Sequence, residues 1–407
     1  MRILLINHYA GSPEYGMEYR PYYLAREWQK AGHHVTIIAG SFSHLRKRQP
    51  DPGYEIIAGI IYYWVKTMRY QGNGILRFFS MLQFVLKLFI LTKRIIIDSD
   101  PDVVIASSTY PLDIYPAYLI AKRNKAKLVF ELHDLWPLSP IIIGGYSKYN
   151  PFIRLLQRAE NFACKKSNCY ISLLVNAKNY LIQHGLKDEK FFYIPNGFSI
   201  DEMDLGGLPI PAEHQETLIK LKHESKLIIG YAGGHSPSNA LKSFILASKK
   251  IKSSQNIKFV LVGDGSQKSE LIKLSIENNL KNVYFLPPVS KASIPTLLNY
   301  FDILYAGGVS SNIHKYGTSF NKITDYMLAE KPIIFAVDEP NSLIETVGCG
   351  IKIAAESETE LINAIRYISE LSVKELKEMG RKGREYALRE LNYVSLAKKI
   401  IDAVERS

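Results

Sequence analysis

The chain has 407 residues, of which 47% are hydrophobic and 22% charged, and its formal net charge is +12. At roughly 150 residues per domain, this length favours two domains, and the composition excludes disordered and fibrous classes. The basic surplus favours an anionic partner, such as a phosphorylated substrate or an anionic lipid surface, although a solubilising surface would also explain it. The sequence has no recognition-helix pattern, no aromatic RNA-binding motif and no basic tail, so we expect no nucleic-acid partner.

The expected compartment follows from the amino terminus and the cysteines. Met1 leads directly into an apolar run, without the pattern of a signal peptide. The three cysteines, at positions 164, 169 and 349, have no metal-binding spacing, and we expect reduced thiols. These features predict a cytoplasmic protein.

In the first half of the chain, apolar runs alternate with amphipathic segments. Strands are predicted at 3–7, 34–39, 103–106, 127–131 and 169–173, and helices at 20–31 and 112–123. Continuous runs of Val, Ile and Leu between such helices are typical of a parallel sheet covered on both faces. We therefore predict a doubly wound α/β domain over residues 1–197.

The same pattern starts again after glycine and proline breaks within 195–211. Strands are predicted at 227–231, 258–262, 282–286, 303–305, 332–336 and 350–353, with glycine turns at 233–234 and 263–265 before helices. A second doubly wound domain is therefore predicted over residues 198–392. Ligands of such sheets bind beyond the carboxyl ends of the strands, so we expect the site in a cleft between the domains.

One segment departs from the pattern. Of the 17 residues from Ile75 to Leu91, 13 are apolar, and the region Lys66–Ile97 holds six basic and no acidic residues. The four polar residues of this stretch fall within an arc of roughly 120° on a helical wheel. The run is short for a transmembrane helix and fits a helix lying on an anionic membrane surface. The alternative is a core helix with snorkelling cations.

Two segments of the second domain could bind a nucleotide. Gly233 and Gly234 follow a buried strand, where glycines let a phosphate approach backbone N–H groups, although a tight turn alone also requires glycine. Residues 316–327 form a Gly/Thr/Ser loop that opens a helix, with Lys322 and Asp325 on one face. A cation near a diphosphate and a carboxylate near ribose hydroxyls would suit a nucleotide, whereas the alternative is an ordinary surface ion pair.

Two segments of the first domain could act on sugars. His133 and Asp134 come directly after a buried strand, where they could bind sugar hydroxyls or handle a proton, although a lone histidine is often structural. The loop 7–16 and the start of the following helix are preferred as an acceptor-binding region over a plain connection. Its candidate residues are Gly11, Glu14, Gly16 and Arg20.

These residues resemble glycosyltransferase family 4, and within it the WbuB-like transferases of bacterial O-antigen and capsule assembly. The strongest motifs are Asp-Leu-Trp-Pro at 134–137, Ile-Pro-Asn-Gly at 194–197, Tyr-Ala-Gly-Gly at 231–234 and Ser-Phe-Asn-Lys-Ile-Thr-Asp-Tyr-Met at 319–327. The family's signature is a pair of glutamates separated by seven residues. Here the second position is Asp325 and the first is Gly317, whose side chain is missing, so the amides of Gly317–Ser319 are expected to replace it.

The resemblance implies an α/β fold of the GT-B type: two Rossmann-like domains, an interdomain cleft, and a C-terminal helix within 393–407 that crosses back to the first domain. It also implies transfer with retention of anomeric configuration, without a metal or other cofactor. The implied catalytic set is His133, Asp134 and Lys322. The implied donor-binding set is Gly233, Gly234, Val289, Gly317, Thr318, Ser319, Asn321, Lys322 and Asp325.

The predicted function is therefore transfer of a sugar, either an N-acetylated amino sugar or a deoxy sugar, from a UDP-sugar to a lipid-linked or glycan acceptor. The expected setting is bacterial surface polysaccharide synthesis at the inner face of the plasma membrane. Two alternatives stay open: a non-catalytic partner that binds nucleotide sugar or glycan, and a sugar-nucleotide 2-epimerase of the same fold.

Overall fold

The computed structural model describes residues 1–72, 74–204, 206–251 and 256–407. Its contacts divide the chain into two compact units, Met1–Asn196 with Tyr393–Ser407, and Gly197–Asn392. The expected boundaries were 1–197 with 393–407, and 198–392. Residue 73, within the expected membrane-binding region, and residue 205, within the expected linker, lie outside the described residues.

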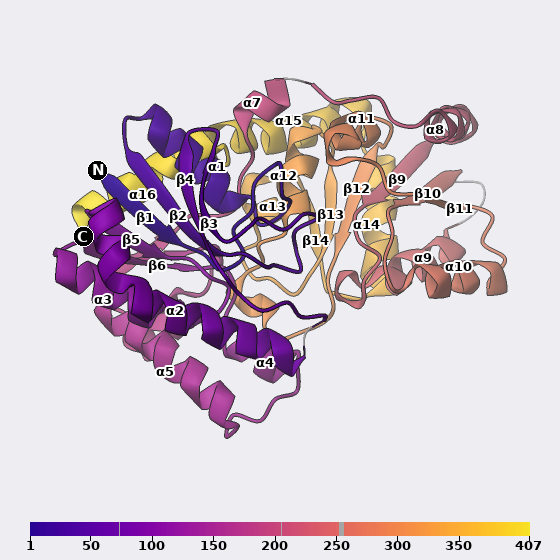
Figure 1. Ribbon diagram of the computed structural model, residues 1–407. Helices are drawn as coiled ribbons and strands as arrows, with labels where there is room; N and C mark the ends of the chain where they lie inside the picture. Colours follow the sequence, from indigo (N-terminus) through magenta and orange to yellow (C-terminus); the bar gives the residue numbers. More distant parts are fainter. Residues whose placement is uncertain (73, 205, 252–255) are drawn as a thin grey trace. The chain divides into compact units, whose positions relative to one another are not determined.

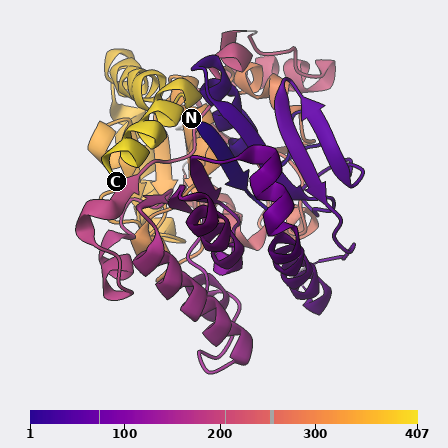
Figure 2. The same cartoon turned by 60° about the vertical axis from the view of Figure 1, so that its left-hand side comes forward.

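The first unit is built on an eight-stranded sheet in the order β3-β4-β2-β1-β5-β6-β7-β8. All neighbours pair in parallel except β3 and β4, which form an antiparallel hairpin at one edge (Figure 2). The strands are β1 Arg2–Ile6, β2 His34–Gly40, β3 Gly53–Ile57, β4 Ile60–Val65, β5 Val103–Ala106, β6 Lys127–Leu132, β7 Cys169–Ser172 and β8 Phe191–Tyr193.

Helices cover both faces of this sheet, with α1 and α16 on one side and α2, α3 and α5 on the other (Figure 1). The helices are α1 Arg20–Lys30, α2 Ile75–Ser99, α3 Ile114–Asn124, α4 Leu138–Ile142, α5 Pro151–Lys166, α6 Lys178–Gln183 and α16 Tyr393–Arg406. The proline at the first turn of α1 and of α5 suits a helix start, because the first N–H groups have no intrahelical partner.

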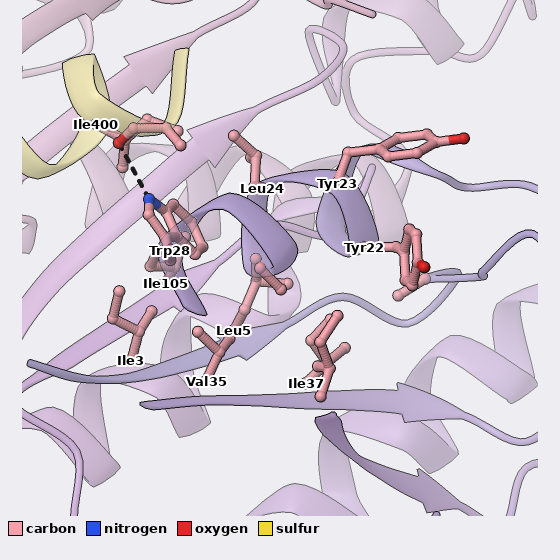
Figure 3. Close-up of a cluster of buried hydrophobic side chains, with 14 of the residues drawn as sticks. Ile3, Leu5, Tyr22, Tyr23, Leu24, Trp28, Val35, Ile37, Ile105 and Ile400 are labelled. Atoms are coloured by element: carbon pink, nitrogen blue, oxygen red, sulfur yellow. Dashed lines mark hydrogen bonds between the residues drawn. The ribbon is translucent and has the colours of Figure 1, made fainter. Parts of the chain in front are cut away.

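The carboxyl-terminal helix α16 packs into the core of the first unit. Its residues Leu396 and Ile400 are buried with Trp28 of α1 and with Ile3 and Leu5 of β1 (Figure 3). The Trp28 indole also donates a hydrogen bond to the carbonyl of residue 397 (3.0 Å). The last 15 residues are therefore part of the first unit, although 196 residues of the second unit precede them in the chain.

The second unit is built on a six-stranded, wholly parallel sheet in the order β11-β10-β9-β12-β13-β14. One core joins it to α8, α11, α12, α13 and α15, and a second core joins its other face to α9, α10 and α14. The strands are β9 Leu227–Ala232, β10 Ile257–Val262, β11 Val283–Leu286, β12 Ile303–Gly307, β13 Ile333–Ala336 and β14 Gly350–Ile353. The helices are α7 Ile200–Asp204, α8 Ala212–Glu224, α9 Leu241–Lys250, α10 Lys268–Glu277, α11 Ile294–Leu298, α12 Asn321–Leu328, α13 Leu343–Val347, α14 Glu358–Glu370 and α15 Val373–Glu390.

The prediction of two α/β units with doubly wound sheets is confirmed. Every predicted strand end lies within two residues of the observed one. The sequence interpretation omitted the β3–β4 hairpin and the short edge strand β8. The hairpin reverses through Ala58 and Gly59, which both have positive φ angles of 50° and 83°, and only glycine adopts such angles without strain.

Candidate active site

Two interlocked glycine turns lie at the carboxyl ends of β9 and β10. Gly233 donates its N–H to the carbonyl of Val262 (3.0 Å), and its own carbonyl lies against Gly263. A Cβ atom on Gly263 would lie 1.9 Å from the Gly233 oxygen, and the φ angle of Gly263 is +150°. Only glycine permits this approach, so the two turns form one rigid backbone edge.

The ammonium group of Lys322 lies beside this edge. It donates to the amide oxygen of Asn239 (2.6 Å) and to the hydroxyl of Tyr231 (3.2 Å), and it sits over the Tyr231 ring at 4.7 Å. A Cβ atom on Gly233 would lie 3.6 Å from the nitrogen. The fold therefore brings together Gly233 and Lys322, about 90 residues apart in the chain, as the sequence motifs predicted for a common site.

Both hydrogen-bond partners of the Lys322 ammonium are neutral, and burial lowers its pKa from 10.5 to about 8. Among the residues that the structure describes, no carboxylate pairs with this cation. Lys322 is half-buried, and a partly desolvated cation without a counter-ion is stabilised by an anion that reaches it. The alternative of a plain Lys322–Asp325 ion pair does not fit this arrangement.

Helix α12 begins directly before this lysine, and its amino terminus has no side-chain cap. The first N–H groups of a helix have no carbonyl partner within the helix, and they favour negative charge. A hydrogen bond fixes the helix to the end of β9, because the backbone N–H of Ala232 donates to the hydroxyl of Tyr326 (3.0 Å). The amino end of α12 and the Lys322 ammonium thus offer donors at one place, an arrangement suited to a phosphate.

The loop before α12 is held by a buried carboxyl group that the sequence interpretation missed. Glu339, which follows β13, is 4% exposed and accepts a hydrogen bond from the Thr318 hydroxyl (2.7 Å). Burial raises the pKa of Glu339 to about 7, although hydrogen bonds from Thr318 oppose the rise. Gly317 is buried with a φ angle of +106°, and Ser319 is half-buried. The Gly317–Ser319 loop therefore has a defined backbone next to α12.

Asp325 lies one turn further along α12 and is exposed, and its carboxylate has no hydrogen-bond partner within the described part of the chain. The surrounding protein nevertheless keeps bulk water from much of the group and raises the pKa of its carboxyl to about 6; Lys291 opposes this rise and Glu202 adds to it. This carboxylate is available to accept hydrogen bonds.

The other predicted donor residues differ in how close they lie to Lys322. Gly234 is exposed, and its carbonyl accepts hydrogen bonds from Tyr231 (2.7 Å) and Asn239 (2.9 Å), the partners of Lys322. Asn321 is exposed at the first residue of α12. Val289 is half-buried against the core after β11, and it is not among the hydrogen-bond partners of Lys322.

In the first unit, His133 follows the carboxyl end of β6 and belongs to a buried polar network. Its Nε2 atom lies 3.1 Å from the Glu131 carboxylate and 3.0 Å from the Ser107 hydroxyl. The side chain is 11% exposed. Asp134 is engaged locally: one carboxylate oxygen accepts from the N–H of Leu135 (2.8 Å) and from the hydroxyl of Ser139 (2.6 Å). Asp134 is thus hydrogen-bonded within the turn that precedes α4 and to one residue of that helix.

The loop predicted to bind an acceptor is compact, and one of its residues needs correction. Gly11 and Gly16 are buried in a tight turn, where a Cβ atom on Gly11 would lie 1.9 Å from the Gly16 oxygen. Glu14 is exposed at the tip of this turn. Arg20, however, is 1% exposed and pairs with Glu131 (2.9 Å). Its guanidinium is occupied in the interior, so a direct contact with an acceptor does not fit the structure.

Helix α2 presents an apolar face to solvent. The exposed residues, which we call the α2 apolar face, are Ile75, Leu76, Phe79, Leu86, Phe89 and Ile90. Within the described residues, α2 is the one helix long and apolar enough to cross a membrane by length and composition, and a third of its most apolar window is buried. The polar residues Arg77, Ser80, Gln83 and Lys87 all bond to other parts of the unit. The polar arc of α2 thus holds the helix to the first unit, and the buried side of the helix packs on the core.

Across residues 1–72, 74–204, 206–251 and 256–407, no three His, Cys, Asp or Glu side chains are grouped to hold a metal ion. The partners Tyr231, Asn239, Ser107, Glu131 and Glu339 were absent from the predicted site. Tyr231 and Glu131 lie near the ends of buried strands, a position that could have marked them. No local pattern marks Asn239, Ser107 or Glu339, because only the fold brings them to their partners.

Comparison with known proteins agrees with this architecture. The family model described as Glycosyltransferase Family 4 matches residues 15–202, and the model described as Glycosyl transferases group 1 matches residues 214–386. The Escherichia coli protein WcaI, named as a putative glycosyl transferase of colanic acid biosynthesis, is 22% identical over 296 residues, which cover 70% of this chain and 69% of that protein.

Solved structures share the fold over the whole chain. HepE of Anabaena, solved with UDP and glucose, has a TM-score of 0.67 at 17% identity and covers 100% of both chains. WaaG, a glycosyltransferase involved in lipopolysaccharide biosynthesis, has a TM-score of 0.66 at 14% identity, also over 100% of both chains. The E. coli trehalose-6-phosphate protein bound with UDP-2-fluoro glucose has a TM-score of 0.73 at 10% identity and covers 100% of this chain and 99% of that one. With both halves matched by their family models, the chain belongs to glycosyltransferase family 4 and is a glycosyltransferase of the GT-B type.

Proposed function

We propose that this glycosyltransferase moves a sugar from a UDP-sugar to a lipid-linked saccharide, with retention of anomeric configuration and without a metal ion, in bacterial surface polysaccharide synthesis. The observation that carries the donor assignment is the Lys322 ammonium, half-buried beside Gly233 at the uncapped start of α12 with neutral hydrogen-bond partners. A diphosphate supplies the negative charge that this group lacks. HepE, which shares this fold, was solved with UDP, and that complex supports the choice of nucleotide.

The protein would bind two polar parts of the donor, the diphosphate and the ribose. Lys322, the first amides of α12 and the backbone edge at Gly233 would bind the diphosphate. Asp325 would accept hydrogen bonds from the ribose hydroxyls, because its carboxylate is free and exposed. The N–H of Gly317 already donates to the His314 carbonyl (2.9 Å), so the expected replacement of the missing glutamate by this amide does not fit the structure. The sugar itself is proposed to be an N-acetylated amino sugar or a deoxy sugar.

In the reaction, the acceptor hydroxyl oxygen forms a bond to the anomeric carbon while the bond from that carbon to the diphosphate oxygen breaks. The hydroxyl proton passes to the leaving diphosphate, and attack from the side on which the diphosphate leaves retains the configuration. Negative charge grows on the diphosphate as the bond breaks, so Lys322 and the helix amides stabilise the transition state more than the ground state. Because the chain itself supplies this cation, we propose that no metal is needed.

The acceptor is proposed to be lipid-linked because of the α2 apolar face. Ile90 is 81% exposed, and Leu86 and Phe79 are exposed on the same side of the helix. The cations Lys93 and Arg94 follow on the same helix, where they could meet anionic headgroups. Ile143, in the loop after α4, is also exposed. The protein would therefore bind the membrane peripherally.

A panel of nucleotide sugars and lipid-linked acceptors tests the transfer. UDP-sugars should raise the melting temperature, and one of them should give a glycosylated product whose anomeric configuration NMR reports as retained, in the presence of EDTA. Lys322→Met should abolish both effects, whereas Lys249→Met, an exposed lysine on α9, should leave them intact. An inverted product, or turnover that EDTA abolishes, would refute the corresponding part of the proposal. Formation of a new free nucleotide sugar would point to the epimerase instead.

Vesicle sedimentation tests the membrane contact. The protein should bind vesicles containing phosphatidylglycerol more strongly than neutral ones, and Phe79→Glu with Ile90→Glu should release it. The matched control is Ile276→Glu, since Ile276 is 71% exposed on α10 of the other unit. Equal binding by the double variant and the control would rule out α2 as the contact.

A further inference from the structure

The Glu131 carboxylate, at the end of β6, has hydrogen-bond donors on both oxygens. Its Oε1 atom accepts from the Nε (3.1 Å) and Nη2 (2.9 Å) atoms of Arg20, and its Oε2 atom accepts from the Ser107 hydroxyl (2.6 Å). Burial alone would raise the pKa of Glu131, but the charge of Arg20 and the bonds from His133 and Ser107 outweigh it and hold the pKa well below its usual value. Glu131 is therefore ionised and can only accept hydrogen bonds.

This fixes where the Ser107 proton lies. A serine hydroxyl has one hydrogen, and Ser107 donates it in a hydrogen bond to the ionised Glu131 oxygen 2.6 Å away. The amide of Asn7 also donates to the Ser107 hydroxyl oxygen (3.3 Å) and to its backbone carbonyl (2.6 Å). The Ser107 oxygen is thus an acceptor toward any further neighbour.

That neighbour is the Nε2 atom of His133, which lies 3.0 Å from the Ser107 hydroxyl oxygen and 3.1 Å from Glu131 Oε2. Both atoms within hydrogen-bond distance of Nε2 are acceptors, so Nε2 must carry a proton. This holds for the neutral ring as well as for the cation. In the neutral ring the lone pair is then on Nδ1.

The Nδ1 atom of His133 has a different environment. No side chain or backbone group among the described residues bonds to it, and it is not one of the buried polar atoms that lack a partner. It therefore has access to solvent. His133 directly follows β6, and the carboxyl ends of parallel strands are where ligands of such sheets bind.

We propose that Arg20, Glu131 and Ser107 are positioning residues that fix the proton of His133 on Nε2, so that Nδ1 is the atom that accepts a hydrogen bond from a substrate hydroxyl. The nature of the substrate, a sugar, rests on the proposed function. The position of the proton on the His133 ring does not. The hydroxyl belongs either to the transferred sugar or to the acceptor. The groups that act on the ring charge are Glu131, Arg20 and the buried Asp113.

The proton position can be measured without any activity. In protein labelled with ¹⁵N at its ten histidines, the resonances that vanish in His133→Asn identify His133. At a pH where the ring is neutral, Nε2 should show the ¹⁵N chemical shift of a protonated nitrogen, and Nδ1 that of an unprotonated one. Ser107→Ala keeps the Arg20–Glu131 pair and should retain this tautomer, whereas Glu131→Gln replaces the ionised acceptor by a neutral amide and should let both tautomers appear. A proton on Nδ1 in the wild type, or averaging between both tautomers, would overturn the inference even if transfer is observed.

Two substitutions of His133 test which nitrogen acts on the substrate. The amide group of asparagine lies near the position of Nδ1, whereas that of glutamine reaches the position of Nε2. His133→Asn should therefore keep at least tenfold more kcat/KM than His133→Gln, and equal or reversed activities would refute the role of Nδ1. The substrate whose KM rises in His133→Gln identifies the source of the hydroxyl. Absence of transfer in the wild type would refute the proposed function and leave the tautomer result standing.

Discussion

Binding of UDP should be coupled to the uptake of a proton by Lys322. Burial holds the pKa of this ammonium near 8, and its partners Tyr231 and Asn239 carry no charge. Burial also raises the pKa of Tyr231 well above its usual value, so the phenol stays protonated across the relevant range. A diphosphate beside the ammonium favours its charged form and raises the pKa of Lys322. UDP therefore binds the protonated enzyme.

The size of the effect follows from the pKa. With a value of about 8, roughly a tenth of the Lys322 side chains are neutral at pH 7 and roughly nine-tenths at pH 9. The dissociation constant of UDP should rise about tenfold between these pH values, which corresponds to about 1.4 kcal/mol. The terminal phosphate of UDP, with a second pKa near 6, is still about a tenth protonated at pH 7 but ionised at pH 9, so the uptake at pH 9 is the diagnostic value.

Isothermal titration calorimetry in pairs of buffers with different ionisation enthalpies measures this linkage directly. Uptake should be about 0.1 proton per UDP at pH 7 and about 0.9 at pH 9. Lys322→Met should bind more weakly at both pH values and take up almost no proton, whereas Lys249→Met should match the wild type. A dissociation constant that stays flat from pH 7 to 9, or uptake that persists in Lys322→Met, would refute the assignment of Lys322 to the diphosphate.

Three further substitutions test the packing around the site. Gly263→Ala places a Cβ atom 1.9 Å from the Gly233 carbonyl oxygen and should cost about 1–3 kcal/mol of unfolding free energy, together with a loss of UDP binding. Trp28→Ala empties the core beneath α16 and should cost about 3–5 kcal/mol in denaturant unfolding. Glu339→Gln tests the carboxyl that holds Thr318: since the pKa of Glu339 rises from 4.5 to about 7 on folding, the folded state binds more protons and stability falls as pH rises through this window. The variant lacks this loss, so its stability relative to the wild type should increase by up to about 3 kcal/mol between pH 4.5 and 7.

Each of these substitutions has a matched control. Gly234→Ala meets no atom closer than 4.0 Å and should leave the unfolding free energy nearly unchanged. Trp28→Phe keeps most of the buried volume and should cost less than the alanine variant. Glu216→Gln, at an exposed site, should show no pH-dependent difference. An unfolding transition of Gly263→Ala that matches that of Gly234→Ala would contradict the steric account of the two turns.

The residues of the donor site differ in how far sequence could place them. The motif around Lys322 and the pair Gly233-Gly234 marked two strand-to-helix turns, and parallel sheets put such turns at one edge. This reasoning could not predict the role of Glu339, because its carboxyl group reaches Thr318 from the loop after β13. Spacing along the chain gives the residues of a turn, not the residues that another strand brings to it.

Arg20 shows the same limit in the first unit. Its position after a loop at the end of β1 suggested contact with a ligand, and the structure instead buries it against Glu131. The two side chains are 111 residues apart, so no local pattern could pair them. The β3–β4 hairpin was also missed: its edge strand β3 is partly exposed and lacks a continuous apolar run, although β4 is apolar throughout.

The amino-acid sequence by itself determined the alternation of buried strands and amphipathic helices, and with it the two parallel α/β sheets, because hydrophobic periodicity and glycine turns act over a few residues. The return of the last helix to the first core was expected from the family resemblance, whereas tertiary structure alone decided that Lys322 is a cation among neutral partners and that Glu131 orients His133. These properties depend on charges and packing between residues far apart in the chain, where burial strengthens electrostatic interactions and no local pattern records which side chains will meet.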